Sequence, residues 1–397
     1  MKKLNVGLIG AGFMGKAHVI GYANMPTLFW PAPAVPILRS VHDINAEISK
    51  EAVARFGFEK HEVSWQAIVN DPEIDIISIC TPNDSHAEIA IAALKAGKHV
   101  LCEKPMSNSF EDAKTMAEAA IVAKEKGIKS MCAYQYRRIP AIVFAKQLIE
   151  EGKIGKLLNI RGQYLQSWSA DPNSPLSWRF QKKVSGVGTT GDIATHVIDI
   201  TQYLAGDITD VVSQVSTFIP QRPVQECGVD LLGTVKIPGD AKLADVDVDD
   251  ESSFLVKFKS GAVGSIEATR NAWGRNNFLT LEIHGTKGSI VFNYERLNEL
   301  QVCFSDSPDD RRGFTTIYTG PLHPYPEATW NIQGLNIGYG ELKTIEIYEF
   351  IKAIAENTES STNFEQSYKV EEVVQAVMKS HQTNTWQTVR DERGNLV

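Results

Sequence analysis

This 397-residue chain lacks the features of disulfide-stapled, membrane-spanning and nucleic-acid-binding proteins. Its five cysteines are scattered and form no CxxC pair, so we expect no disulfide framework, no structural zinc and a cytoplasmic location. No run approaches the roughly 18 apolar residues of a membrane span. A net charge of −8 without a long basic run argues against nucleic-acid and anionic-membrane partners. The length predicts two or three domains.

The N-terminal region carries a dinucleotide-binding pattern. Residues 4–9 predict a buried strand, "GAGFMG" follows at once, and residues 16–25 predict a helix. In this context the first glycine allows a tight turn, the second lets backbone approach a pyrophosphate, and the third permits close helix–strand packing. The alternative is a glycine-rich turn that binds nothing. The cofactor contacts expected here are Gly10, Gly12, Phe13, Met14 and Gly15.

An acidic residue at the end of the second strand would bind a ribose hydroxyl. Asp43 ends the predicted strand 36–43, lies 28 residues after Gly15, and favours NAD over NADP because a carboxylate repels a 2′-phosphate. The alternative is a solvated turn residue. The extra length is a proline-rich, aromatic insertion at 25–36, which we expect to be non-helical and to lie beside the cofactor or contact another subunit.

Strands and helices continue to alternate to about residue 136, which predicts a parallel, doubly wound sheet. Ligands of such sheets bind outside the carboxyl ends of the strands, where "TPN" and "EKP" are placed. His86 is either a polar residue near a helix start or part of the cofactor cleft. The further candidates for cofactor or substrate contacts are Thr81, Pro82, Asn83, His86, Glu103 and Lys104.

Four segments together resemble a known family. "GLIGAGFMG", "TPNDSH", "CEKPM" and "GDIATHVID" occur in the order found in the glucose–fructose oxidoreductase/inositol dehydrogenase family. The resemblance implies an α/β fold, with a Rossmann domain at 1–133 and an α/β domain at 134–397 that has a large, mostly antiparallel sheet; terminal helices could pack back on the first domain. It also implies bound NAD, a sugar or polyol substrate, and a homo-oligomer, either a dimer or a tetramer.

Oxidation of a secondary alcohol needs a base for the hydroxyl proton and a group that stabilises the alkoxide. Lys104, at a strand end, is the expected partner of the alkoxide, and His196 titrates in the range needed for the base. Asp192 lies four residues earlier, on the same face if the segment is α-helical, and would orient the ring or bind a second hydroxyl. The pair could instead be a hydrogen-bonded pair at the edge of a core. Because no further ligands cluster with it, we expect no metal.

Aromatic and polar side chains would complete a sugar pocket. "LFWPAPAVP" and "YLQSWSADPNSPLSWRFQKKVSG" are similar to a branch of the family that oxidises the 3-hydroxyl of an anhydro-sugar with NAD. That resemblance places Tyr136, Gln166 and Trp168 at the substrate, and we add Trp273 and Tyr339. Trp178 and Arg179 either cover the nicotinamide or reach the phosphates of the cofactor, or belong to the core.

The later chain predicts strands at 211–218, 253–259, 262–269, 278–284 and 288–293 and helices at 341–356 and 366–380. We expect the acidic run at 239–251 to be a solvated loop. The leading functional hypothesis is an NAD-dependent dehydrogenase of a pyranose or anhydro-sugar. The alternatives are an inositol dehydrogenase, an NADPH-dependent keto-sugar reductase, or a non-catalytic dinucleotide-binding regulator, which would be expected to lack Lys104 or His196.

Overall fold

The computed structural model describes residues 1–224 and 241–390. These divide into two compact units. The first unit comprises residues 1–138 together with 325–368, and the second comprises 139–324 together with 369–397. The predicted division lies after residue 133, with terminal helices that could pack back on the first domain; in the structure the first unit ends at residue 138 and also includes residues 325–368.

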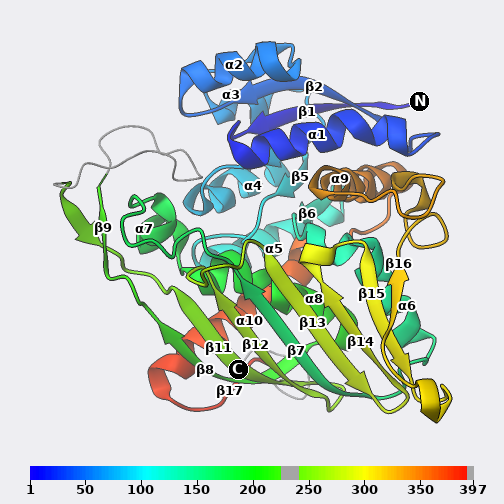
Figure 1. The fold of residues 1–397 in the computed structure, drawn as a ribbon. Helices are drawn as coiled ribbons and strands as arrows, with labels where there is room; N and C mark the ends of the chain where they lie inside the picture. The colour runs from blue at the N-terminus through cyan, green and yellow to red at the C-terminus, as the bar shows by residue number, and fades with distance from the viewer. Residues whose placement is uncertain (225–240, 391–397) are drawn as a thin grey trace. The chain divides into compact units, whose positions relative to one another are not determined.

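The first unit is built on a six-stranded parallel sheet in the order β3-β2-β1-β4-β5-β6. Figure 1 labels β1, β2, β5 and β6 of this sheet. Strands β4, β5 and β6 are short and almost fully buried, as in "IISI" of β4, which is the pattern expected of strands covered on both faces. The strand order reverses direction between β1 and β4, the position where such sheets bind ligands. The strands are β1 Lys3–Ile9, β2 Val35–His42, β3 Lys60–His61, β4 Ile76–Ile79, β5 His99–Cys102 and β6 Ser130–Cys132.

Helix α9 joins this unit from far along the chain and packs against α1. A Cβ on Gly21 of α1 would lie 2.9 Å from the carbonyl oxygen of Lys343 on α9, so this close approach requires glycine. The helices of the unit are α1 Phe13–Leu28, α2 Ala46–Phe56, α3 Trp65–Asn70, α4 His86–Lys95, α5 Phe110–Lys124 and α9 Tyr339–Glu356.

The second unit contains a nine-stranded sheet in the order β16-β15-β14-β13-β7-β12-β11-β8-β17. Only the β7–β12 pair is parallel, so the expected large, mostly antiparallel sheet is confirmed. The strands are β7 Leu157–Leu165, β8 Ile208–Ser216, β11 Glu251–Phe258, β12 Val263–Thr269, β13 Phe278–Gly285, β14 Gly288–Asn293, β15 Glu299–Phe304, β16 Thr315–Tyr318 and β17 Gln387–Thr388. A two-stranded ribbon, β9 Gln221–Pro223 and β10 Leu243–Asp245, stands apart from it.

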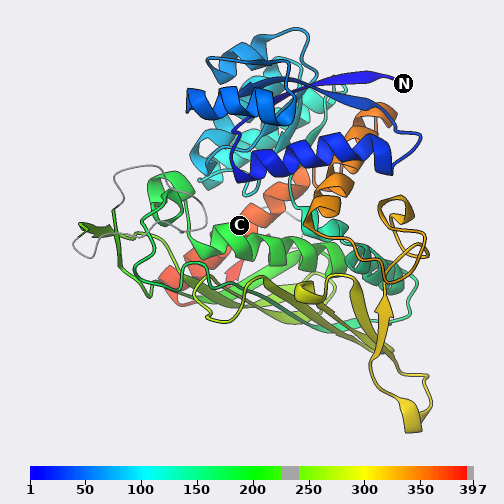
Figure 2. The ribbon, with the colours of Figure 1, turned by 45° about the horizontal axis from the view of Figure 1, so that its top comes forward.

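One face of this sheet is covered by helix α8, Thr195–Ala205, which lies along the strands in Figure 2. Val197 of α8 reaches β7 so closely that a Cβ at Gly162 would lie 2.4 Å from it. The other helices of this unit are α6 Pro140–Glu150 and the short α7 Lys182–Ser185, while α10 Phe364–Thr383 begins in the first unit. No strand was predicted at β7, although this strand lies near the middle of the sheet.

Two expectations about local structure are corrected. Helix α1 continues to Leu28 with Pro26 inside its last turn, so the non-helical insertion begins after residue 28 and not at 25. The acidic run is not a solvated loop, because Asp249 and Asp250 are buried; its residues 239 and 240 lie outside the described residues.

Among the described helices, none is long and apolar enough to cross a membrane.

Candidate active site

The glycine-rich turn between β1 and α1 has the geometry that its sequence predicts. Gly10 adopts φ +91°, a left-handed conformation that other residues rarely adopt. A Cβ on Gly15 would lie 2.3 Å from the carbonyl oxygen of Gly10, whereas a Cβ on Gly12 would meet no atom within 4 Å. The first turn of α1 carries no acidic residue, which leaves its positive end suited to a phosphate. The turn therefore fits a dinucleotide.

Asp43 follows β2 and is tied to this turn. One carboxylate oxygen accepts the Ala11 N–H at 2.9 Å, and the other accepts the Asn45 N–H at 3.0 Å. The carboxylate is thereby held beside the glycines in a fixed orientation.

The proline-rich, aromatic insertion packs partly against α9. Its Phe29 stacks on Tyr348 of α9 with ring centroids 3.8 Å apart, while Trp30 is 70% exposed. Contact of this segment with the cofactor or another subunit stays a prediction.

His86 lies between two strand-end turns of the first unit. Its ring nitrogens lie 2.9 Å from the Thr81 carbonyl oxygen and 3.0 Å from the Pro105 carbonyl oxygen. Burial lowers the pKa of His86, and the neutral ring carries one N–H, which it can donate to one of these two carbonyl oxygens. Contact of His86 with the cofactor stays a prediction. Asn83 is buried in the same region, and Pro82 is exposed.

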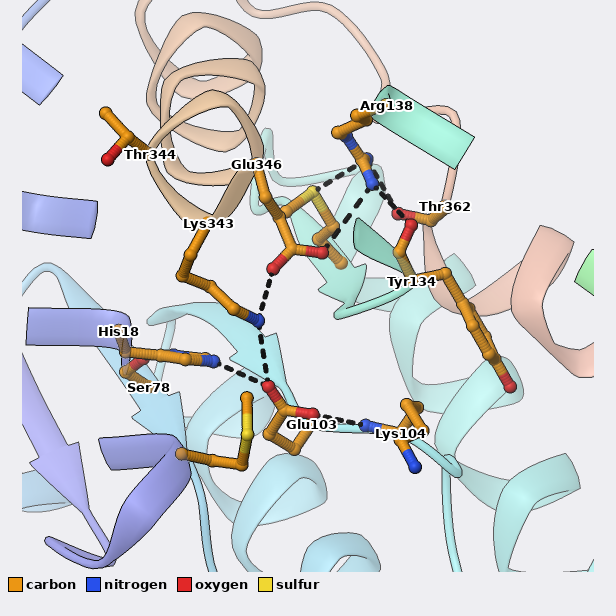
Figure 3. A network of polar contacts seen from close by, with 12 residues as sticks. His18, Ser78, Glu103, Lys104, Tyr134, Arg138, Lys343, Thr344, Glu346 and Thr362 are labelled. Atoms are coloured by element: carbon orange, nitrogen blue, oxygen red, sulfur yellow. Dashed lines mark hydrogen bonds and ion pairs between the residues drawn. The ribbon is translucent and has the colours of Figure 1, made fainter. Parts of the chain in front are cut away.

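The Glu103 carboxylate is buried in the first unit and bound on both oxygens (Figure 3). One oxygen accepts from His18 Nε2 at 2.9 Å and from Lys343 Nζ at 3.0 Å, and the other accepts the main-chain N–H of Lys104 at 3.2 Å. Burial alone would raise the pKa of Glu103, but Lys343 and His18 hold it well below its usual range. The half-buried Lys104 thus follows a residue that is fixed by charge. The predicted contact of Glu103 with the cofactor stays a prediction.

Tyr339, the first residue of α9, lies beside the glycine-rich turn. Its ring centroid is 6.3 Å from that of Phe13, and its hydroxyl lies 3.6 Å from the sulfur of Met14. Burial raises the pKa of the Tyr339 hydroxyl. The structure therefore brings this predicted sugar contact to predicted cofactor contacts. Tyr136 is buried in the short helix η2, Gln135–Arg138, of the same unit.

Asp192 does not lie on an α-helix, which corrects the premise behind its pairing with His196. Residues Thr190–Ala194 form a π-helical turn that leads into α8, and His196 is the second residue of α8. Such turns frequently occur at functional sites. The Asp192 carboxylate lies 3.3 Å from the guanidinium of Arg270, which has no exposed surface.

Asp249 holds the segment that precedes Asp192. Its carboxylate accepts the N–H groups of Gly188 and Thr190, both at 2.7 Å, and the Thr190 hydroxyl at 2.8 Å. A Cβ on Gly188 would lie 2.0 Å from the Asp249 carbonyl oxygen, so the two backbones touch. Arg270 donates to that same carbonyl oxygen at 3.3 Å. Neither Asp249 nor Arg270 was predicted from the sequence; Asp249 lies in the acidic run and Arg270 in "EATRN".

His196 belongs to a connected set of side chains in the second unit. It is 7% exposed, and its ring lies edge-on to Tyr164 at 5.9 Å between centroids. The Gln166 amide donates to the Tyr164 hydroxyl at 3.1 Å, and Trp168 Nε1 donates to Gln166 at 2.9 Å. The structure thus brings together three of the predicted substrate contacts, His196, Gln166 and Trp168.

The remaining predicted residues of this unit differ in placement. The Arg179 guanidinium stacks 4.2 Å above the Trp178 ring, and burial lowers the pKa of Arg179 while Asp192 opposes that effect. The Arg270 guanidinium lies 5.1 Å from the Trp168 ring centroid, so Asp192, Arg270 and Trp168 adjoin. Trp273 is 73% exposed.

In the described ranges, 1–224 and 241–390, no group of three or more His, Cys, Asp or Glu residues could hold a metal ion.

A Rossmann unit with this turn, together with a unit that carries a buried histidine and a fixed carboxylate, defines an NAD-dependent oxidoreductase. Residues 4–131 match the family model of oxidoreductases with an NAD-binding Rossmann fold, and residues 142–291 match the GFO/IDH/MocA C-terminal domain. The chain belongs to this oxidoreductase family, which confirms the resemblance drawn from its motifs, its α/β fold and NAD as its cofactor.

Individual proteins show the same relationship. The chain is 55% identical to levoglucosan dehydrogenase of Pseudarthrobacter phenanthrenivorans, over 97% of this chain and 98% of that protein. A structure of levoglucosan dehydrogenase in complex with NADH and levoglucosan has a TM-score of 0.91 and 53% identity, covering 98% of this chain and all of the other. Myo-inositol 2-dehydrogenase of Thermotoga maritima is 27% identical over 78% of this chain and 80% of its own length.

Proposed function

We propose that this chain oxidises the 3-hydroxyl of levoglucosan, or of a closely related pyranose, to the 3-keto sugar. The observation that carries the proposal is the 55% identity to levoglucosan dehydrogenase over nearly the whole length of both proteins. The connected set of His196, Gln166 and Trp168 supports it, because an aromatic ring packs on the C–H face of a pyranose while polar groups bind its hydroxyls.

The residues of the first unit would hold the dinucleotide and the alkoxide. The turn at 10–15 would bind the pyrophosphate, and Asp43 would accept a hydrogen bond from the ribose. Bound NAD supplies the acceptor of the hydride. The Lys104 ammonium would stabilise the negative charge that develops on the substrate oxygen, as a preorganised cation does without rearrangement. Thr81, Pro82, Asn83, Trp178 and Arg179 stay proposed contacts of the cofactor.

The residues of the second unit would handle the proton and orient the sugar. His196 would accept the hydroxyl proton, since imidazole takes protons near neutral pH. Asp192, held against Arg270, would accept a hydrogen bond from a hydroxyl of the sugar. Tyr136, Trp273 and Tyr339 stay proposed substrate contacts. Lys104 would therefore stabilise the charge of the alkoxide, and His196 would transfer the proton.

We also propose a homo-oligomer, a dimer or a tetramer, that forms through the face of the large sheet opposite α8. The outward side chains of its strands line a shallow hollow of about 790 Å³, and Leu255 and Val263 on this face are 52% and 48% exposed. A cytoplasmic location is part of the proposal, supported by the described cysteines Cys80, Cys102, Cys132 and Cys303, which form no disulfide with one another. Light scattering of the purified chain, beside a Leu255→Glu variant, tests the association.

The test of function is a screen of NAD reduction with levoglucosan, glucose, methyl glucosides, inositols and sugar acids, followed by NADH absorbance. The proposal expects the highest kcat/KM with levoglucosan and a 3-keto product by NMR. The highest kcat/KM with an inositol would instead favour a cyclic polyol dehydrogenase, and a preference for NADPH with keto-sugars would favour a reductase. No turnover with any of these substrates would refute the proposal.

A further inference from the structure

Five ionisable side chains form a buried cluster behind Lys104, all within the first unit (Figure 3). We call them the Glu103 cluster; they are His18 of α1, Glu103 after β5, Arg138 of η2, and Lys343 and Glu346 of α9. Each is no more than 5% exposed. Charged groups are costly to bury, so the arrangement needs a balance of charge and hydrogen bonds.

The hydrogen bonds around His18 determine its protonation. Tyr22 donates to Ser78 Oγ, Ser78 lies 2.7 Å from His18 Nδ1, and His18 Nε2 lies 2.9 Å from Glu103. The carboxylate can only accept, so Nε2 carries the proton, and the Ser78 hydroxyl then donates to Nδ1. With this neutral tautomer, each hydrogen bond from Tyr22 through Ser78 and His18 to Glu103 has one donor and one acceptor. Burial and the charge of Lys343 also lower the pKa of His18.

Lys343 bridges the two carboxylates of the cluster. Its Nζ lies 3.0 Å from Glu103 and 2.7 Å from Glu346. Burial alone would lower the pKa of Lys343, but these two carboxylates outweigh burial and raise it. Arg138 lies 3.7 Å from the second oxygen of Glu346, so two cations balance two carboxylates. Without Lys343, one buried negative charge would have no compensating cation within the cluster.

The far oxygen of Glu103 accepts the Lys104 N–H, which connects the cluster to the E-K-P turn. We propose that Lys343 is a positioning residue for Lys104: it binds the Glu103 carboxylate and so fixes the main chain from which the Lys104 side chain projects. Through His18 the same carboxylate is tied to α1, the helix that follows the glycine-rich turn. The catalytic importance of Lys343 rests on the proposed function; its hold on the Lys104 main chain does not.

The test compares Lys343→Met with the double variant Glu103→Gln/Lys343→Met in the full-length chain. Methionine keeps the length of the side chain but leaves Glu103 without its cation. In the double variant no uncompensated charge remains. The glutamine oxygen can still accept the Lys104 N–H, and its amide can donate to His18 in the other tautomer. Lys352→Met, on the same helix but at the ring of Tyr348, is the matched control.

The first readout needs no substrate: amide hydrogen exchange of a peptide spanning residues 103–106, measured by mass spectrometry. We expect faster exchange in Lys343→Met, recovery in the double variant, and no change in Lys352→Met. A purely structural defect would instead accelerate exchange throughout the unit. Exchange at 103–106 equal to wild type in Lys343→Met would overturn the proposal, whatever the wild type does with sugars.

The second readout is turnover of the folded protein. We expect kcat of Lys343→Met to fall about 10- to 100-fold, the range of a small misplacement of a catalytic group, with the NAD dissociation constant within about twofold. The double variant should regain part of this loss, since the two changes share one interaction. An unchanged kcat in Lys343→Met, or an equal loss in the double variant, would contradict the positioning role. Absence of turnover in the wild type would refute the proposed function alone.

Discussion

The carboxylate of Asp192 lies 3.3 Å from the guanidinium of Arg270, seventy-eight residues further along the chain. Arg270 is fully buried, whereas the Asp192 side chain keeps 23% of its surface exposed. One partner is therefore an immobile anchor, and the other presents an accessible carboxylate. The pair gives Asp192 a fixed orientation that its helical spacing to His196 did not predict.

Arg270→Lys tests this anchor. Lysine keeps the charge, but a single ammonium replaces the planar fork that reaches both Asp192 and the Asp249 carbonyl oxygen. We expect kcat/KM for the sugar to fall about tenfold, a loss of about 1.4 kcal/mol, while the KM for NAD stays unchanged. Arg275→Lys, on an exposed turn with its guanidinium over Phe278, is the control. Equal losses in both variants would contradict the anchor.

Asp249→Asn tests the support of the π-helical turn. The carboxylate accepts from Gly188 and from both donors of Thr190, and asparagine would turn an N–H₂ group toward one of these sites. We expect the free energy of unfolding to fall by about 2 kcal/mol, as for a buried, charge-assisted hydrogen bond that is lost. Urea unfolding provides the measurement. The exposed Asp245→Asn should change this free energy by less than about 0.5 kcal/mol, and a similar value for Asp249→Asn would refute the assignment.

Asp43→Asn tests cofactor selection. Asparagine can still accept the Ala11 N–H, but it no longer repels a 2′-phosphate. We expect the wild type to prefer NAD over NADP in kcat/KM, and the variant to narrow that preference by about tenfold or more. Glu51→Gln, an exposed charge change on α2, should leave the ratio as it is. A wild type that uses NADP better would contradict the role of Asp43.

His99 makes the stability of the first unit dependent on pH. Burial, aided by Lys2, lowers the pKa of His99 to about 4 from the ordinary 6.5, and its Nδ1 accepts the Lys129 N–H. In the unfolded chain the ring takes a proton below 6.5, whereas the folded chain resists protonation until about 4. This contribution is therefore present above pH 6.5 and lost as the pH falls toward 4.

The loss amounts to at most about 3 kcal/mol for a shift of this size. Urea unfolding at several pH values should show a shallower decline in His99→Asn, which keeps an acceptor for Lys129 and does not titrate. His61→Asn, at an exposed position, should follow the wild type. Parallel pH profiles for wild type and His99→Asn would contradict this origin of the acid sensitivity.

Local chemistry was predictable from the sequence where a few adjacent residues determine it. Gly10 and Gly15 permit the tight turn after β1, and Asp43 directly follows β2, whose end lies beside that turn. Lys343 could not be assigned from sequence because its partner Glu103 is 240 residues away, and nothing local distinguishes it from a surface lysine. The π-helical turn at Asp192 depends likewise on the distant Asp249, which looked like part of a solvated acidic loop.

The central claim is that Lys104 and His196 perform the proton and charge chemistry of an NAD-dependent sugar dehydrogenase. Its most direct test is a rapid-mixing measurement of hydride transfer from levoglucosan to NAD in Lys104→Met and His196→Asn, beside NAD binding by fluorescence titration. We predict a hydride-transfer rate lower by about 10²- to 10⁴-fold in each variant, with NAD affinity retained. Variants that bind NAD and still transfer hydride at the wild-type rate would contradict the claim.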